Sequence, residues 1–293
     1  MMMTKITNDY LEVTVSPEGA TLTSIRDAKT GQEYLWQGDP AYWTGQAPNL
    51  FPFVGRLHEE RYTLDGVSYP MTRHGFVRHA QMTLEYAQPD QCCFALSQSP
   101  ETLKMYPYRF TFRIVYRLAE NTLHIAFQVE NQDDKLLYCG MGGHPGFQVP
   151  MDPGLSFSDY RLTFPEACQP HQVVFSPSLQ VAPDRPDYPL EQGRYLPLRH
   201  DLFDLDAVVL ADAPRQVTLS SPKGSHGVTV GYPQMPYVGF WHQPKTDAPY
   251  LCIEPWATLP GRDNTVEELS TLPDRIAVPA GQTFSNDWWI KVW

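Results

Sequence analysis

Four short segments place polar or charged side chains beside glycine, proline or aromatic residues. These segments are residues 48–57, 73–76, 142–147 and 252–256. The side chains in them that could take part in chemistry are Arg56, His74, His144 and Glu254. Residues that restrict the backbone hold a neighbouring side chain in a fixed position, as loops that form binding sites require. The four segments are therefore the candidate functional site.

Glu254 is the least easily explained of these side chains as a structural residue. It lies in the apolar stretch 250–256, where an unpaired carboxylate would be costly to bury. A lone histidine is more often a hydrogen-bonded structural residue, and a lone arginine is more often on the surface. A functional interpretation therefore depends on the four residues acting together.

Proton transfer at the anomeric centre of a sugar is the chemistry that suits this set. Ring opening of an aldopyranose needs a base that takes the proton of the C1 hydroxyl and an acid that protonates the ring oxygen. A carboxylate and an imidazole on opposite sides of the hemiacetal supply both functions. An arginine, a second histidine and an aspartate could bind the remaining hydroxyls. The reaction requires no cofactor and no metal, so the sequence predicts neither.

Alternating hydrophobic residues predict that strands position this site. Residues 109–118 have an apolar face and a mostly polar face. The apolar face consists of two phenylalanines, Ile114, Tyr116 and Leu118, and the polar face consists mainly of arginines and Thr111. The alternation resumes at residues 123–129 after a turn at Glu120 and Asn121, which predicts an antiparallel hairpin. The 28 prolines are spread along the chain and leave little room for long helices.

Further hairpins are expected around short turn sequences. The expected strand pairs are 61–64 with 67–71, 10–15 with 20–26, 82–87 with 92–97, and 216–220 with 227–232. Residues 38–55 and 176–201 resemble loops, and a short helix is expected near 99–104 or 266–270. This density of strands without alternating helices predicts an all-β sandwich or barrel. We expect one domain over residues 1–293.

Charge and cysteine content restrict the partners and the compartment. The 33 acidic and 22 basic residues give a net charge of −11, which disfavours nucleic acid and anionic membranes as partners. The five cysteines follow no metal-binding or disulfide spacing, and the first ten residues lack the apolar stretch of a signal peptide. No apolar run is long enough to span a membrane. We expect a cytoplasmic protein, a monomer or dimer, that acts on a small molecule.

Several ordered motifs resemble the galactose mutarotase (aldose 1-epimerase) superfamily, and within it the mutarotase-related branch encoded with lactose operons. The matching segments are residues 18–25, 49–57, 74–76, 144–147, 203–208, 236–241 and 252–256. They extend over nearly the whole chain in the right order, which makes the likeness far more specific than any one motif. The resemblance implies an antiparallel β-supersandwich with an open cleft on one face.

The resemblance also implies a role for each site residue. Glu254 matches the general base and His144 the general acid, while Arg56 and His74 match ligands of the sugar hydroxyls. Asp206 most resembles the remaining sugar-binding aspartate, although Asp204 is expected on the same strand face. The implied activity is that of an aldose 1-epimerase, an isomerase of carbohydrate metabolism. The sequence around His144 and the Glu-Pro-Trp sequence differ from the corresponding segments of authentic galactose enzymes. The resemblance therefore supports the reaction at C1 more strongly than it supports a preference for galactose.

Three alternatives remain open from the sequence. Arg73, Arg78 and His79 surround His74 and could bind the phosphate of a hexose 6-phosphate. The same scaffold could also serve as a non-catalytic sugar-binding protein. A metal enzyme of the cupin type could use a ligand set of His74, His144, His171 and Glu254, although no metal-binding spacing supports it.

Overall fold

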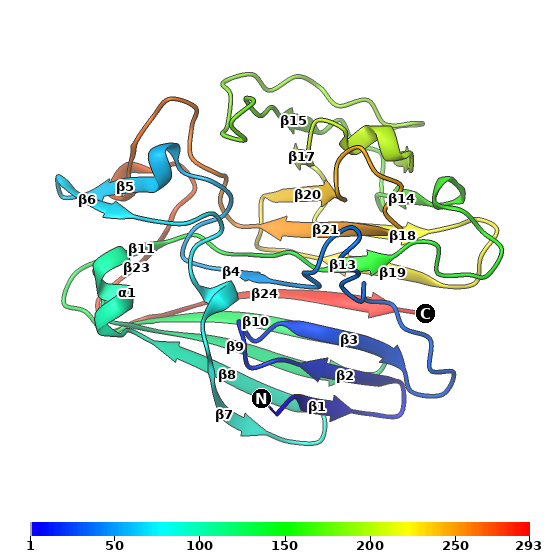
Figure 1. Ribbon diagram of the computed structural model, residues 1–293, viewed down its shortest axis with the longest axis horizontal. Coiled ribbons are helices and arrows are strands. Elements are labelled where there is room, and N and C mark those ends of the chain that lie inside the picture. The colour runs from blue at the N-terminus through cyan, green and yellow to red at the C-terminus, as the bar shows by residue number, and fades with distance from the viewer. Residues whose placement is uncertain (1) are drawn as a thin grey trace.

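The computed structural model describes residues 2–293 and shows an almost entirely β fold. Within those residues, every pairing between named strands is antiparallel except that of β22 (Glu267–Glu268) with β5 (Arg61–Leu64). The all-β, antiparallel prediction is therefore confirmed. Two large sheets form most of the described molecule, and Figure 1 labels most of their strands.

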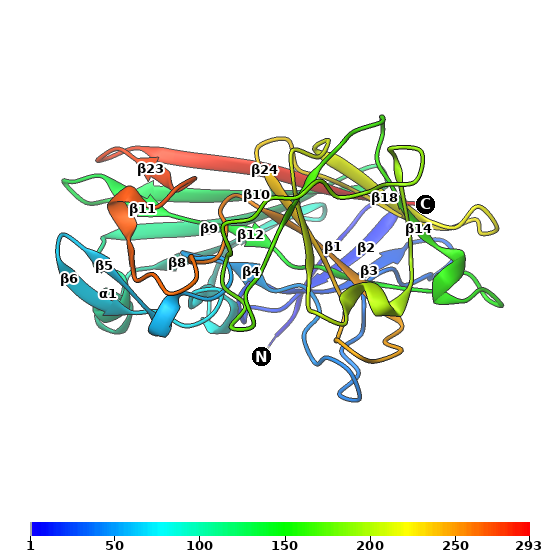
Figure 2. The same cartoon turned by 90° about the horizontal axis from the view of Figure 1, so that it is seen from above.

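Nine strands of the described chain form the first large sheet. In order across the sheet they are β16 (Tyr195–Pro197), β14 (Arg161–Thr163), β18 (Gln216–Ser220), β19 (Gly227–Gly231), β24 (Thr283–Val292), β10 (Thr122–Asn131), β9 (Phe110–Ala119), β8 (Gln91–Ser97) and β7 (Thr83–Ala87). The long strands β24, β10 and β9 lie side by side at its centre (Figures 1 and 2).

Seven strands of the described chain form the second large sheet, which carries the candidate site. Six follow the order β15 (His171–Val173), β17 (Val208–Ala211), β20 (Tyr237–Trp241), β21 (Tyr250–Trp256), β12 (Gly142–Gly143) and β4 (Asn49–Leu50). The seventh, β13 (Gly146–Gln148), also pairs with β21. The strand β21 therefore contacts three others and lies at the centre of this sheet.

Smaller elements complete the fold. Within the described residues there are three further sheets. They consist of β1 (Thr4–Thr7), β2 (Leu11–Val15) and β3 (Leu22–Asp27); β22, β5 and β6 (Val67–Pro70); and β11 (Leu137–Cys139) with β23 (Ile276–Val278). The α-helix α1 (Pro100–Met105) begins at a capping box formed by Ser99 and Thr102. Short 3₁₀ turns span His58–Glu60, Val77–His79, Phe157–Asp159, His200–Phe203 and Leu269–Thr271. Among residues 2–293, no helix has both the length and the apolarity that crossing a bilayer requires.

The main core lies between the two large sheets. The predicted apolar face of β9 is buried in it, and so are Leu251 and Ile253 of β21. The ring of Phe51, just beyond β4, stacks on Phe112 of β9 with 4.2 Å between ring centroids, which joins the two sheets directly. Because side chains alternate along a strand, the residues of β21 between and beyond Leu251 and Ile253 face away from this core.

The expected hairpins are confirmed to within a few residues at their ends. The predicted helix at 99–104 is α1, whereas residues 266–270 form β22 and part of a 3₁₀ turn. The two stretches expected as loops are largely irregular, but each contains one short strand, β4 and β16 respectively. Two- and three-residue strands carry too little sequence pattern to be separated from a loop.

Candidate functional site

A cavity of about 760 Å³ opens on the face of the seven-stranded sheet that is turned away from the main core. This volume falls in the range of small-molecule sites, about 300–1,000 Å³. All five residues predicted for the site line it: Arg56, His74, His144, Asp206 and Glu254. The structure therefore brings together side chains that lie up to 198 positions apart in the sequence.

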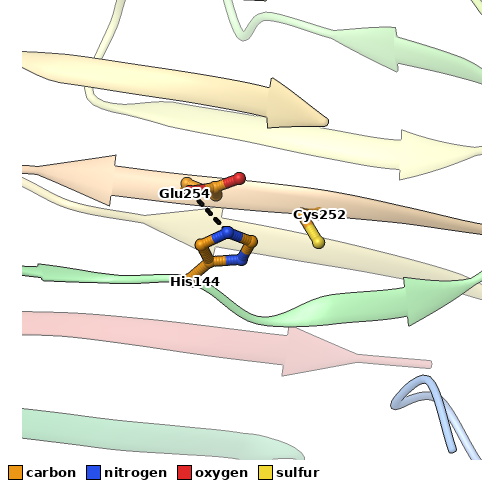
Figure 3. Close-up of side chains that lie close together, drawn as sticks. All are labelled: His144, Cys252 and Glu254. Carbon is orange, nitrogen blue, oxygen red and sulfur yellow. Dashed lines mark ion pairs between the residues drawn. The ribbon is translucent and has the colours of Figure 1, made fainter. Parts of the chain in front are cut away.

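Glu254 reaches the cavity because of its position in β21. Cys252, Glu254 and Trp256 alternate with the core residues of this strand and so face the cavity side. The Glu254 carboxylate is 2% exposed, and its Oε2 atom lies 3.3 Å from Nε2 of His144 (Figure 3). The neighbouring strand carries Gly239 opposite Glu254, so no side chain of β20 lies over the carboxylate at this position.

His144 lies in the link between β12 and β13, which both pair with β21. Its backbone N–H donates to the carbonyl of Pro48, with 3.1 Å between the atoms. The imidazole packs among the rings of Trp43, Trp241 and His74, whose centroids lie 5.1, 5.7 and 5.7 Å away. These contacts fix the ring so that Nε2 faces Glu254.

Burial shapes the protonation of this pair. It raises the pKa of Glu254 well above its usual value, and the charge of Asp206 adds to the rise. Burial also lowers the pKa of His144 to about 3, and repulsion from Arg73 and Arg78 contributes. The pair titrates as a unit and holds one proton between its two residues over a wide pH range. The arrangement can therefore give a proton to one ligand atom while taking one from another.

His74 and Arg56 are positioned by the same backbone contact. The Gly55 N–H donates to Nδ1 of His74 at 3.1 Å, and the His74 N–H donates to the Gly55 carbonyl at 2.8 Å. Burial and the surrounding positive charges lower the pKa of His74 well below its usual value. A neutral imidazole that accepts at Nδ1 carries its proton on Nε2, where it can donate to a ligand. Arg56 follows directly and extends an exposed side chain into the cavity.

Asp206 lies in the cavity lining, whereas Asp204 does not belong to it. The expectation that both lie on one strand face is wrong, because β17 begins only at Val208. Asp206 occupies the left-handed region with a φ of 92°, and its Oδ1 accepts from the Ala207 N–H at 2.9 Å. Such strained backbone conformations concentrate at functional sites. Burial raises the pKa of Asp206, against the opposing effect of the Ala207 N–H.

Several residues of the cavity were not identified from the sequence. Trp43 comes from the irregular stretch before β4, and Cys252 lies two residues before Glu254 on the same strand face. Trp241 and Trp256 also line the cavity, and both pack against buried residues. The density of aromatic residues at 34–43 was the one signal that could have indicated Trp43.

One group of side chains has the composition of a metal site. His144, Cys252 and Glu254 offer ligand atoms that lie within 4.8 Å of one another (Figure 3). His171, the additional ligand in the cupin alternative, is elsewhere and pairs with Asp187 and Asp212. The cupin ligand set is therefore not assembled in this structure.

Comparisons with known proteins agree with this fold and cavity. The family model described as aldose 1-epimerase matches residues 2–284. Protein LacX of Lactococcus lactis (plasmid form) is 35% identical over 286 residues, which cover 94% of this chain and 93% of LacX. The galactose mutarotase related enzyme of Lactobacillus acidophilus superposes with a TM-score of 0.94 at 32% identity and covers 100% of this chain and 97% of its own. A galactose mutarotase-like protein of Lactobacillus casei gives a TM-score of 0.94 at 29% identity, with complete coverage of both chains. The family model and the LacX identity both extend over nearly the whole sequence, and on that basis the chain belongs to the aldose 1-epimerase family.

Proposed function

We propose that the protein is an aldose 1-epimerase that interconverts the α and β anomers of an aldohexose by acid–base ring opening. The contact between His144 and Glu254 is the observation that carries this proposal. The two groups are in direct contact rather than on opposite sides of the hemiacetal, which is where the sequence predicts them. The ring oxygen and the C1 hydroxyl of a pyranose are both bonded to C1, so two adjacent groups can still serve both oxygens at once. The open cavity beside this pair has room for the sugar.

Each proton is accounted for in the proposed reaction. The Glu254 carboxylate takes the proton of the C1 hydroxyl while the His144 imidazolium protonates the ring oxygen, and the bond between C1 and that oxygen breaks. Rotation about C1–C2 presents the other face of the aldehyde. His144 then takes the proton of the C5 hydroxyl as the ring closes, and Glu254 returns its proton to the aldehyde oxygen.

One proton is shared by the pair throughout this cycle. The ion pair that begins ring opening and the neutral pair that accompanies the open chain contain the same number of protons. Burial favours the neutral pair in the empty cavity, whereas sugar hydroxyls would stabilise the charged pair by donating and accepting hydrogen bonds. In this proposal Arg56, His74 and Asp206 bind the other hydroxyls and orient the ring.

Five free cysteine thiols in residues 2–293 also favour a reducing, cytoplasmic compartment for this reaction.

The test compares anomer interconversion by the wild type, Glu254→Gln and His144→Gln, measured by polarimetry or magnetisation-exchange NMR on galactose and glucose. We expect each substitution to lower kcat/KM by about 100-fold or more, as is typical for loss of a general acid or base. Glu85→Gln is the matched control, because Glu85 pairs with Arg113 on the nine-stranded sheet, outside the cavity.

A binding measurement separates catalysis from sugar binding alone. Calorimetry with a 1,5-anhydrohexitol, which has no C1 hydroxyl and cannot mutarotate, should show similar affinities for the wild type and Glu254→Gln. If the wild type accelerates no aldose yet binds the anhydrohexitol, the protein is a sugar-binding protein and the epimerase proposal is wrong.

A further inference from the structure

The cavity contains three arginines that form no ion pair in the described chain, although the acidic residues Glu18, Asp206 and Glu254 also line it and the charges of Arg56 and Arg73 act on Asp206. Arg56, Arg73 and Arg78 line it, and within residues 2–293 none of the three forms an ion pair or a side-chain hydrogen bond. Other arginines contrast with them: Arg113 lies between Glu85 and Glu130, and Arg262 pairs with Glu267. Among the described residues, exposed arginines such as Arg117 of β9 are also unpaired, so what distinguishes these three is that they line one cavity.

Arg78 is the most informative of the three because part of its guanidinium is buried. Its Nε atom is inaccessible to solvent and has no hydrogen-bond partner in the described chain. A buried N–H of a charged group without an acceptor is unusual and costs free energy. Burial and repulsion from Arg73 lower the pKa of Arg78 accordingly. An anionic acceptor from a ligand would remove both penalties.

The backbone around Arg78 is held in place. Arg78 lies in the 3₁₀ turn Val77–His79, which packs against the turn between β2 and β3. Contact there is so close that a Cβ atom on Gly19 would lie 2.8 Å from the Arg78 carbonyl oxygen. The hydroxyl residues Ser16, Thr21 and Thr23 of the same hairpin also line the cavity. The guanidinium is therefore presented by a rigid turn with further donors nearby.

The arginines also lie within electrostatic reach of the reacting pair. Arg73 and Arg78 flank His74, whose ring contacts that of His144. The charges of Arg73 and Arg78 both act on His144, and the charge of Arg73 also acts on Glu254. One ligand could therefore contact the arginines with one end and the pair His144–Glu254 with the other.

We propose that the sugar substrate carries an anionic group, a phosphate ester or a carboxylate, and that Arg73 and Arg78 bind it. This inference rests on the proposed epimerase function. The group cannot be attached at C1, because mutarotation requires a free hydroxyl there. Guanidinium groups bind phosphate and carboxylate through paired, charge-assisted hydrogen bonds, whereas a neutral sugar would leave Arg73 and Arg78 without an anionic hydrogen-bond partner.

The kinetic test compares glucose, glucose 6-phosphate and glucuronate, and the corresponding galactose series, at low ionic strength. We expect kcat/KM for one of the anionic sugars to exceed that for the neutral sugar by about tenfold or more, as expected for charge-assisted hydrogen bonds. The comparison of the 6-phosphate with the uronate identifies the anion. Added salt should reduce the preference, because it screens the charges.

Variants assign the preference to these residues. Arg73→Gln and Arg78→Gln should each lower the ratio of anionic to neutral kcat/KM by about tenfold or more. Arg73 is exposed, so its variant should fold even if loss of Arg78 disturbs the turn. Arg117→Gln is the matched control, since Arg117 is an exposed arginine of β9 that does not line the cavity. It should leave the ratio unchanged.

A binding measurement separates failure of this inference from failure of the proposed function. Calorimetry with 1,5-anhydroglucitol and its 6-phosphate requires no turnover, and the 6-phosphate should bind about tenfold more tightly to the wild type but not to Arg78→Gln. Selective binding without acceleration of any aldose would overturn the epimerase function and support the anion site. Epimerase activity without preference for any anionic sugar, in kinetics and in calorimetry, would overturn the anion site alone.

Discussion

Nε2 of His144 and Oε2 of Glu254 lie 3.3 Å apart although the two residues are 110 positions apart in the sequence. The contact arises from strand pairing, because the segments on both sides of His144 pair with the strand that carries Glu254. The separation between the two groups is therefore set by the spacing of neighbouring strands rather than by flexible loops.

The pH dependence of kcat/KM should show a broad plateau. Below a pH of about 3, His144 is protonated while Glu254 also holds a proton, so the pair carries two protons. His144 can then no longer accept the proton of the C5 hydroxyl, and ring closure fails. As the pH rises through the elevated pKa of Glu254, the shared proton is lost and activity falls. Rate measurements corrected for buffer catalysis would check this. An acidic limb near the ordinary histidine value of about 6.5 would contradict the pairing.

Replacement of Glu254 by glutamine should stabilise the folded protein at neutral and higher pH. The pKa of Glu254 is higher in the folded state than in the unfolded state, so the wild type loses stability as the pH rises between these two values. Each pH unit in that interval corresponds to about 1.4 kcal/mol. Urea unfolding of the wild type and Glu254→Gln from pH 5 to pH 8 would reveal a growing difference. A difference that does not depend on pH would show that the carboxyl group titrates normally.

Two glycines with positive φ should differ strongly in their tolerance of alanine. Gly66 has a φ of 77° and open space where a Cβ would lie, so Gly66→Ala should cost only about 1–2 kcal/mol. Gly75 has a φ of 72°, and its Cβ would lie 2.1 Å from the carbonyl oxygen of Phe51. Gly75→Ala should cost more than about 3 kcal/mol and also displace His74. Thermal unfolding of both variants makes the comparison, and equal losses would contradict it.

Divalent metal ions should inhibit the proposed reaction rather than accelerate it. The proposed reaction uses only proton transfers, so treatment with EDTA should leave the rate unchanged. Zinc bound to His144, Cys252 and Glu254 would occupy both reacting groups, since thiolate, imidazole and carboxylate are its usual ligands. Micromolar zinc should therefore slow mutarotation, and Cys252→Ser should weaken the inhibition. Activation by zinc or inactivation by EDTA would contradict a metal-free reaction.

The sequence predicted the strands well because the long hairpins alternate strictly between apolar and polar residues. It also identified five residues that share one cavity: four lie in short segments of unusual composition, and Asp206 was indicated by the family resemblance alone. Three features could not be predicted. The left-handed conformation of Asp206 is a property of one residue in an irregular turn, which leaves no periodic signal. The neighbourhood of Trp43 depends on the course of a proline-rich loop, and the buried Nε of Arg78 depends on packing against a distant hairpin.

Because side chains alternate along β21, one strand contributes both to the main core and to the cavity. Leu251 and Ile253 belong to the main core, whereas Cys252, Glu254 and Trp256 face the cavity. Substitutions at the second set can change the chemistry or the preferred ligand without opening holes in the main core. In a mutational scan, substitutions at Leu251 and Ile253 should therefore lower folding yield, whereas substitutions at Glu254 should mainly lower turnover. The same arrangement gives natural variation, or an engineer, a way to alter specificity on an unchanged scaffold.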